Sequence, residues 1–64
     1  MKRLSELIKK YRADKGLSQG EFGSLFGISA QAVSKWERGI CLPDVLLLPR
    51  IAEIIGCSLD ELFE

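Results

Sequence analysis

Glycines followed closely by serines divide this chain into short segments, and this feature constrains the fold more than any other. Gly16, Gly27 and Gly56 each precede a serine by two positions, and Gly39 is a fourth glycine of the same kind. Glycine takes the left-handed conformation that ends a helix, and serine is a preferred residue at a helix start. A chain of 64 residues divided at these points can hold only short helices.

Between the glycines, apolar residues recur at the spacing of a helix rather than with the alternation of a strand. The four stripes are Leu4, Leu7, Ile8 and Tyr11; Phe22, Leu25 and Phe26; Val33 and Trp36; and Ile51, Ala52, Ile54 and Ile55. Residues 58–61 and the Leu62-Phe63 pair after them add a fifth, short helix. The sequence therefore predicts a compact all-α bundle of five helices in a single domain, residues 1–64.

Several local signals set the ends of these helices. Residues 18–21 and 58–61 each run from serine to glutamate in the pattern of a capping box. Pro49 is favourable at a first helical position and disruptive inside a helix, so the fourth helix should begin at Leu48–Pro49. A separate turn is expected over residues 44–47, and Gly27 is expected to end the second helix.

The composition excludes much of enzyme chemistry and every membrane span. The chain has no histidine, and its two cysteines, Cys41 and Cys57, form neither a CxxC pair nor a four-ligand zinc set. No apolar run approaches the ~20 residues of a membrane helix, and Met1-Lys2-Arg3 leads into no apolar signal segment. We therefore expect a cytoplasmic protein without enzyme activity, cofactor, metal or membrane contact, whose cysteines are reduced and serve as small apolar filler.

The zero net charge hides an asymmetry along the chain. Residues 1–40 hold eight basic and four acidic side chains, whereas residues 41–64 hold one basic and five acidic ones. A basic half beside an acidic half indicates one face suited to an anion, and nucleic acid is the natural candidate.

Residues 19–38 have the spacing of a helix-turn-helix. Gly27 lies where a short turn between two crossing helices needs a glycine, and Gly23 has no side chain where the second helix would cross. Ile28, Val33 and Trp36 then point back toward the second helix. This is the geometry of a DNA-reading helix-turn-helix.

The sequence resembles the phage-repressor type of helix-turn-helix domain, also called the xenobiotic-response-element family. The matching stretches are residues 16–19 (GLSQ), 26–29 (FGIS), 33–39 (VSKWERG), 42–44 (LPD) and 56–62 (GCSLDEL). The resemblance implies a lambda-repressor-like five-helix fold and a transcriptional regulator that binds operators as a dimer. It also implies that Arg12 pairs with Glu37, which borders the inward-facing Trp36.

The sequence departs from the family pattern at several positions. Gly20 and Gly23 replace residues that are usually Glu and Ala, and each glycine should weaken the second helix by roughly 0.5–1 kcal/mol. Ile40 and Cys41 stand where many members carry Lys, Ser or Thr near phosphates, so this loop is not expected to bind the DNA backbone strongly.

The outward face of the third helix supplies the candidate DNA contacts. With Val33 and Trp36 turned inward, the exposed residues are Ala30, Gln31, Ser34, Lys35 and Arg38. Gln31 suits an adenine edge, Lys35 a guanine edge or a phosphate, and Ala30 a thymine methyl. Ser34 and Arg38 are expected at phosphates. The resemblance adds Gln19, at the start of the second helix, as a phosphate contact.

Two functions compete for this sequence. The first is a sequence-specific regulator of double-stranded DNA, a repressor that inserts residues 30–38 into the major groove and blocks polymerase. It would act as a weak homodimer, through a last helix that carries Leu59, Leu62 and Phe63. The second is a protein-binding module, such as an antitoxin or adaptor, that docks a protein partner on the apolar segment 40–48.

Overall fold

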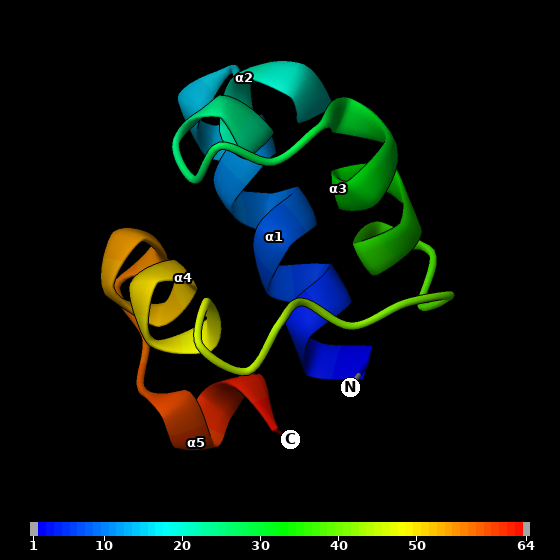
Figure 1. Ribbon diagram of the computed structural model, residues 1–64. Helices are drawn as coiled ribbons and strands as arrows, with labels where there is room; N and C mark the ends of the chain where they lie inside the picture. Colours follow the sequence, from blue (N-terminus) through cyan, green and yellow to red (C-terminus); the bar gives the residue numbers. More distant parts are fainter. Residues whose placement is uncertain (1, 64) are drawn as a thin grey trace.

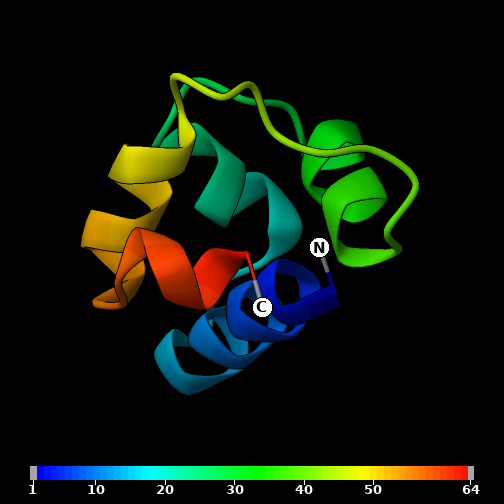
Figure 2. The ribbon, with the colours of Figure 1, turned by 90° about the horizontal axis from the view of Figure 1, so that it is seen from below.

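Helix α1 (Lys2–Lys15) lies at the centre of the view of Figure 1 and along one side of the protein in Figure 2, in the computed structural model. The structure describes residues 2–63, with side chains for residues 3–63. Leu4 and Ile8 are fully buried, and Leu7 and Tyr11 pack against the same core. Gly16 follows the helix in the left-handed conformation, with φ of 66°. The predicted stripe and the predicted stop signal are both confirmed.

Helices α2 (Gln19–Ser24) and α3 (Ala30–Glu37) cross above and beside α1 (Figure 1). Gly27 takes the left-handed conformation of a helix-ending glycine, with φ of 72°, but α2 itself ends at Ser24, earlier than predicted. The amide of Phe26 donates to the Gly23 carbonyl over 2.9 Å, and that of Ile28 donates to the same carbonyl over 2.8 Å. This tightened last turn leaves Leu25 partly exposed rather than in the core.

The two glycines of α2 differ sharply in what surrounds them. A Cβ atom on Gly23 would lie 2.3 Å from the Ile28 carbonyl oxygen, whereas one on Gly20 would meet the Ala30 Cβ at 3.8 Å. Gly23 is therefore required by the close approach of the turn backbone. The expectation that glycine simply weakens the helix is therefore wrong for Gly23, whereas for Gly20, where a Cβ atom would have room, it stays a prediction.

Residues 38–47 carry the chain from α3 to α4 (Leu48–Ile55), passing in front of the N-terminal part of α1 in Figure 1, and α5 (Leu59–Leu62) follows. The fourth helix begins at Leu48, with Pro49 in its first turn, as predicted. The expected separate turn is also present, because the Leu46 and Leu47 amides both donate to Asp44, over 2.9 Å each. Ile51 and Ala52 are buried, but Ile54 and Ile55 are only half-buried.

The core lies where α1 meets α3, α4 and α5 (Figure 2). Phe22 from α2 closes this core, with its ring centroid 6.0 Å from that of Tyr11 and 5.2 Å from that of Phe26. Residues 2–63 form five helices and no strand, so the predicted all-α five-helix bundle is confirmed. Within this described part, no helix has the length and apolar character that crossing a membrane requires.

The two cysteines lie in different environments. Cys57 packs against the core, as expected of small apolar filler. Cys41 is exposed on the connection between α3 and α4, so the filler interpretation is wrong for this residue. Burial raises the pKa of the Cys57 thiol, and the negative charge of Glu61 adds to this effect, which keeps the thiol protonated and unreactive.

Candidate nucleic-acid interface

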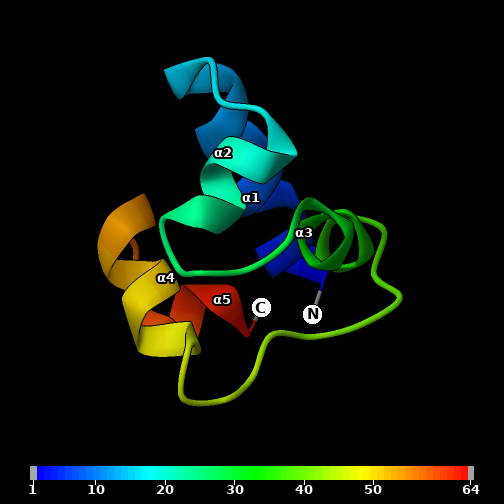
Figure 3. The ribbon, with the colours of Figure 1, turned by 45° about the horizontal axis from the view of Figure 1, so that its top comes forward.

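Helix α3 is capped at its start and packs one face against the core, so its other face is exposed to solvent. The Ser29 hydroxyl accepts the Ala32 amide over 3.2 Å at the start of the helix. Val33 and Trp36 are buried, with 0% and 5% of their surface exposed. Figure 3 shows α3 at the edge of the molecule, beyond α1 and α2. The opposite face of the helix is therefore free to meet a partner.

The six predicted DNA contacts surround one hollow of about 370 Å³ on this outer face, here called the α3 hollow. Gln31, Lys35 and Arg38 are exposed, whereas Ala30, Ser34 and Gln19 are half-buried. Gln19 comes from the start of α2 and the other five residues from α3 and its C-terminal cap.

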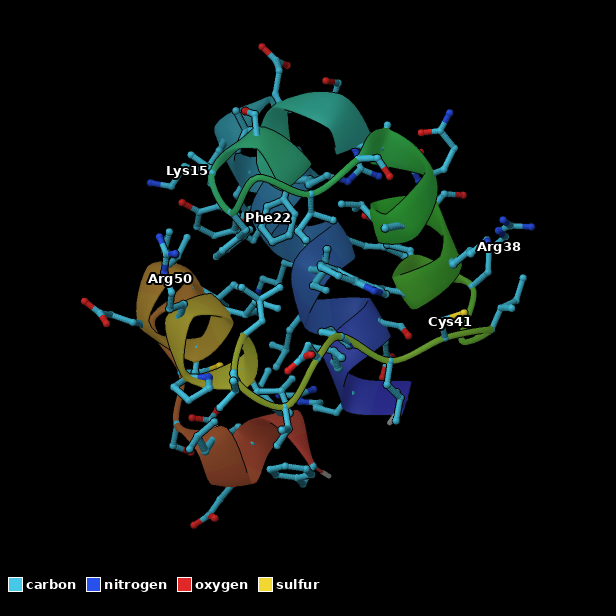
Figure 4. All side chains as sticks on the ribbon, in the orientation of Figure 1. Lys15, Phe22, Arg38, Cys41 and Arg50 are labelled. Carbon is cyan, nitrogen blue, oxygen red and sulfur yellow. The ribbon has the colours of Figure 1, made fainter. Side chains whose placement is uncertain are left out.

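The far end of the α3 hollow is formed by Arg38. Its Nε atom donates to the Ser34 carbonyl over 3.3 Å, which leaves the remaining guanidinium donors free. Figure 4 shows Arg38 on the opposite side of the molecule from Lys15 and Arg50. These two cations instead lie over aromatic rings, Lys15 over Tyr11 and Arg50 over Phe26. They do not belong to the face that carries the α3 hollow.

An ion pair fastens the C-terminal end of α3 to α1. Arg12 donates from Nε to Glu37 Oε2 over 2.6 Å and from Nη2 to Oε1 over 2.8 Å, and its Nη1 reaches the Leu17 carbonyl over 3.0 Å. The pair implied by the family resemblance is thus present. Glu37 is more deeply buried than expected, with 6% of its surface exposed.

The ionisation of Glu37 reflects two opposing effects. Burial alone would raise the pKa of its carboxyl group. Hydrogen bonds from Arg12 and Gln19, together with the charges of Arg12 and Lys9, outweigh burial and hold the pKa below its ordinary value. Glu37 is therefore an ionised carboxylate at neutral pH, and the positive charge of Arg12 balances its charge.

The Gln19 amide takes part in the same network, which the sequence did not indicate. Its Nε2 atom donates to Glu37 Oε1 over 3.1 Å. One of its two N–H groups is therefore already occupied before any ligand arrives. Gln19 and Glu37 are 18 positions apart, and no local pattern links them.

Ser5 is a second residue that sequence reasoning missed. Its hydroxyl is buried and donates to the Trp36 carbonyl over 2.8 Å, so it ties α1 to the last turn of α3. The available signal was a small polar residue between the inward-facing Leu4 and Ile8, where a hydroxyl must find a partner.

A second exposed surface is apolar. It consists of four residues on the connection between α3 and α4, here called the loop surface: Ile40, Leu42, Val45 and Leu46. Pro43 and Leu48 are buried and Leu47 is half-buried, so these four are the large apolar side chains of the predicted docking segment that are well exposed. On α5 and its C-terminal cap, Leu59 and Phe63 are exposed, but Leu62 is fully buried and cannot serve a dimer contact as predicted.

Comparison with known proteins identifies the family. The family model described as "Helix-turn-helix" matches residues 8–62. An uncharacterized SPbeta prophage-derived HTH-type transcriptional regulator of Bacillus subtilis, YonR, is 37% identical over 59 residues, which cover 92% of this chain and 55% of the relative. The ImmF control region 10 kDa protein of Bacillus phage phi105 is 39% identical over 61 residues, 95% of this chain and 68% of the relative.

A solved structure shares the fold. The hydroxypropylphosphonic acid epoxidase from S. wedmorenis superposes with a TM-score of 0.75 at 29% identity. The match covers 95% of this chain but 32% of the epoxidase chain, so the likeness concerns one part of that protein. This chain also spans little more than half of the prophage relative. The helix bundle, the matched residues 8–62 and these relatives together show that the chain belongs to the helix-turn-helix family of the phage-repressor type.

Proposed function

We propose that this chain is a sequence-specific, double-stranded DNA-binding transcriptional regulator that inserts α3 into the major groove. The observation that carries the proposal is the α3 hollow, where six polar or small side chains gather on the free face of a helix fixed at both ends. The relatives described as HTH-type transcriptional regulators support the same function.

Each residue of the α3 hollow has a role in this proposal. Gln31 reads an adenine edge, Lys35 reads guanine or binds a phosphate, and the Ala30 methyl meets a thymine methyl. Ser34, Arg38 and Gln19 bind phosphates on either side of the groove. The chain acts as one DNA-binding unit, with residues 19–38 as its helix-turn-helix core, in the cytoplasm and without an enzymatic role.

The mode of action that we propose is repression by a weak homodimer. The similarity to a phage control-region protein supports a repressor. Such a dimer would have to place its two α3 helices ~34–36 Å apart to reach successive major grooves on one face of a duplex. The exposed Leu59 and Phe63 of α5 offer apolar surface for this contact.

A protein-binding module is the second candidate, and the loop surface favours it. Its four large apolar side chains are between 57% and 84% exposed. Contiguous exposed apolar surface of this kind marks contacts with other proteins. In this alternative an antitoxin-like or adaptor role would use the same fold to hold a protein partner.

Selection of sites from random duplexes, followed by affinity measurements at several salt concentrations, tests the proposal. A DNA-binding regulator should select a defined site, and its affinity should fall steeply with salt because counterions are released. If Lys35 binds a phosphate, Lys35→Ala should lower the salt slope by about one. If it reads guanine, that variant should lose preference at one base position.

The matched control is Lys10→Ala. Lys10 lines a separate hollow beside α4, together with Tyr11 and Ile55. Its loss should change affinity little, because it contributes only to the general field. A wild-type protein that selects no site and binds DNA without salt dependence would reject the DNA-binding proposal in favour of the protein-binding module.

A further inference from the structure

A chain of hydrogen bonds leads from the core to the α3 hollow. Arg12 donates one hydrogen bond to the Leu17 carbonyl and one to each carboxylate oxygen of Glu37. Glu37 Oε1 also accepts the Nε2 amide of Gln19 over 3.1 Å. Glu37 is buried, whereas Gln19 forms part of the rim of the hollow. The network thus joins a buried charge to a side chain that a DNA ligand would meet.

The chemistry of this contact fixes the orientation of the Gln19 amide. An ionised carboxylate can only accept hydrogen bonds, so the amide must turn its NH₂ group, and not its oxygen, toward Glu37. The second N–H of the same group is left as a donor. Ala30, which also lines the hollow, has no polar side-chain atom that could orient the amide instead.

We propose that Glu37, held by Arg12, is a positioning residue for Gln19, and that it presents the remaining amide N–H of Gln19 to a DNA phosphate. This inference rests on the proposed function. An amide that is already ordered loses less freedom on binding than a mobile one, and the affinity gains by that difference. The charge of Glu37 does not oppose the phosphate, because Arg12 neutralises it within the pair.

A double-mutant cycle measured on DNA affinity separates positioning from general support of α3. The probe is the duplex that the wild-type protein selects from random sequence. Gln19→Ala should weaken binding by about tenfold, as expected when a hydrogen bond to a charged group is lost. Glu37→Gln should weaken binding several-fold in the wild-type background and cause no further loss in the Gln19→Ala background.

Stability provides the contrasting readout. Glu37→Gln keeps the shape of the side chain but removes the charge that orients the amide. Glu37→Gln should lower the thermal midpoint by nearly the same amount whether position 19 holds Gln or Ala. The two losses should differ only by the contribution of the hydrogen bond between Gln19 and Glu37. A residue that only supported α3 would instead weaken DNA binding equally in both backgrounds, and that result would overturn the proposal.

A measurement on the wild-type protein tests the proposal even if the Glu37→Gln variant does not fold. The chain has two glutamines, and Gln31 is exposed on α3 whereas Gln19 is tied to Glu37. Side-chain ¹⁵N relaxation should show a rigid Gln19 amide and a mobile Gln31 amide. Equal mobility of the two amides would overturn the proposal, even if Glu37→Gln did not fold.

The outcomes also distinguish this inference from the function on which it rests. If the wild-type protein selects no duplex, the proposed function fails, and this inference fails with it. If the wild-type protein binds its site but the two substitutions weaken binding independently, only the positioning role of Glu37 is rejected.

Discussion

The two connections that flank α3 differ in length and in how closely they pack. The short connection, residues 25–29, turns the chain between α2 and α3 with two amides on one carbonyl, that of Gly23. The long connection, residues 38–47, carries four exposed apolar side chains. Its start is bonded to carbonyls of the last turn of α3, and its end to the carbonyl and side chain of Asp44. The short connection packs so closely on α2 that a methyl group on Gly23 would collide with the Ile28 carbonyl oxygen.

This difference indicates separate roles for the two regions. A tight connection fixes the angle at which α3 leaves α2, and therefore where the polar α3 hollow faces. A loose connection has little influence on that angle, so its apolar side chains are free to meet another protein. Changes near the short connection should damage both fold and DNA binding, whereas changes in the long connection should spare both.

The largest effect is expected where α3 is fastened to α1. Arg12→Met keeps most of the aliphatic stem but leaves the buried Glu37 carboxylate without its partner. Removing one member of a buried pair costs about 3 kcal/mol or more, because the remaining charge is desolvated and unpaired. Chemical denaturation measures this loss. A cost below about 1 kcal/mol, typical of surface pairs, would show that the pair is not effectively buried.

The next effect concerns the short connection itself. Gly23→Ala should lower the free energy of unfolding by about 1–3 kcal/mol, because the new methyl group must displace the Ile28 carbonyl. The matched control is Gly20→Ala in the same helix, which should raise stability by roughly 0.5–1 kcal/mol. Thermal melts of both variants test the contrast. Similar effects of the two substitutions would contradict the close approach at Gly23.

Acid should selectively weaken the ion pair between Arg12 and Glu37 that joins α3 to α1. The folded-state pKa of Glu37 lies below its ordinary value of 4.5, so its contribution is complete above about that pH and is lost as pH falls through the folded value. The stability difference between wild type and Glu37→Gln should therefore be constant near neutrality and shrink in acid. Urea midpoints from pH 7 to pH 3 measure it. A difference that is independent of pH would contradict the ion pair.

The smallest effect is expected in the long connection. Asp44→Ala removes an exposed hydrogen bond to the Leu46 amide and should cost only about 0.5 kcal/mol. Leu46, 84% exposed, should tolerate replacement by serine with a change within about 0.5 kcal/mol. DNA affinity should stay at the wild-type level in both variants. A large loss of DNA binding would mean that this connection also positions α3.

Much of the fold could be predicted because its signals are local. Serine caps, the left-handed glycines and Pro49 act within one helical turn, so they revealed nearly every helix boundary. The end of α2 was missed because the Ile28 backbone returns to Gly23, which is a tertiary contact. In a helix as short as α5, spacing could not show that Leu62 turns inward.

The candidate site was predictable to a similar extent. The inward direction of Val33 and Trp36 fixes the opposite face of α3, so helical geometry predicted the exposure of Gln31, Lys35 and Arg38. Ala30 and Ser34, predicted to be exposed, are half-buried. The bond between Gln19 and Glu37 could not be predicted, because it depends on how α2 packs against α3. The buried Ser5 contact with Trp36 depends in the same way on the packing of α1.

The most direct test of the central claim is the site preference of Gln31→Ala, measured by selection from random duplexes beside wild type and Leu46→Ser. If α3 lies in the major groove, Gln31→Ala should lose about 1–3 kcal/mol on the best site and relax preference at about one base position. Leu46→Ser should select the wild-type site. If Gln31→Ala retained the complete wild-type preference, α3 would not read the groove, and the loop surface would become the better candidate for function.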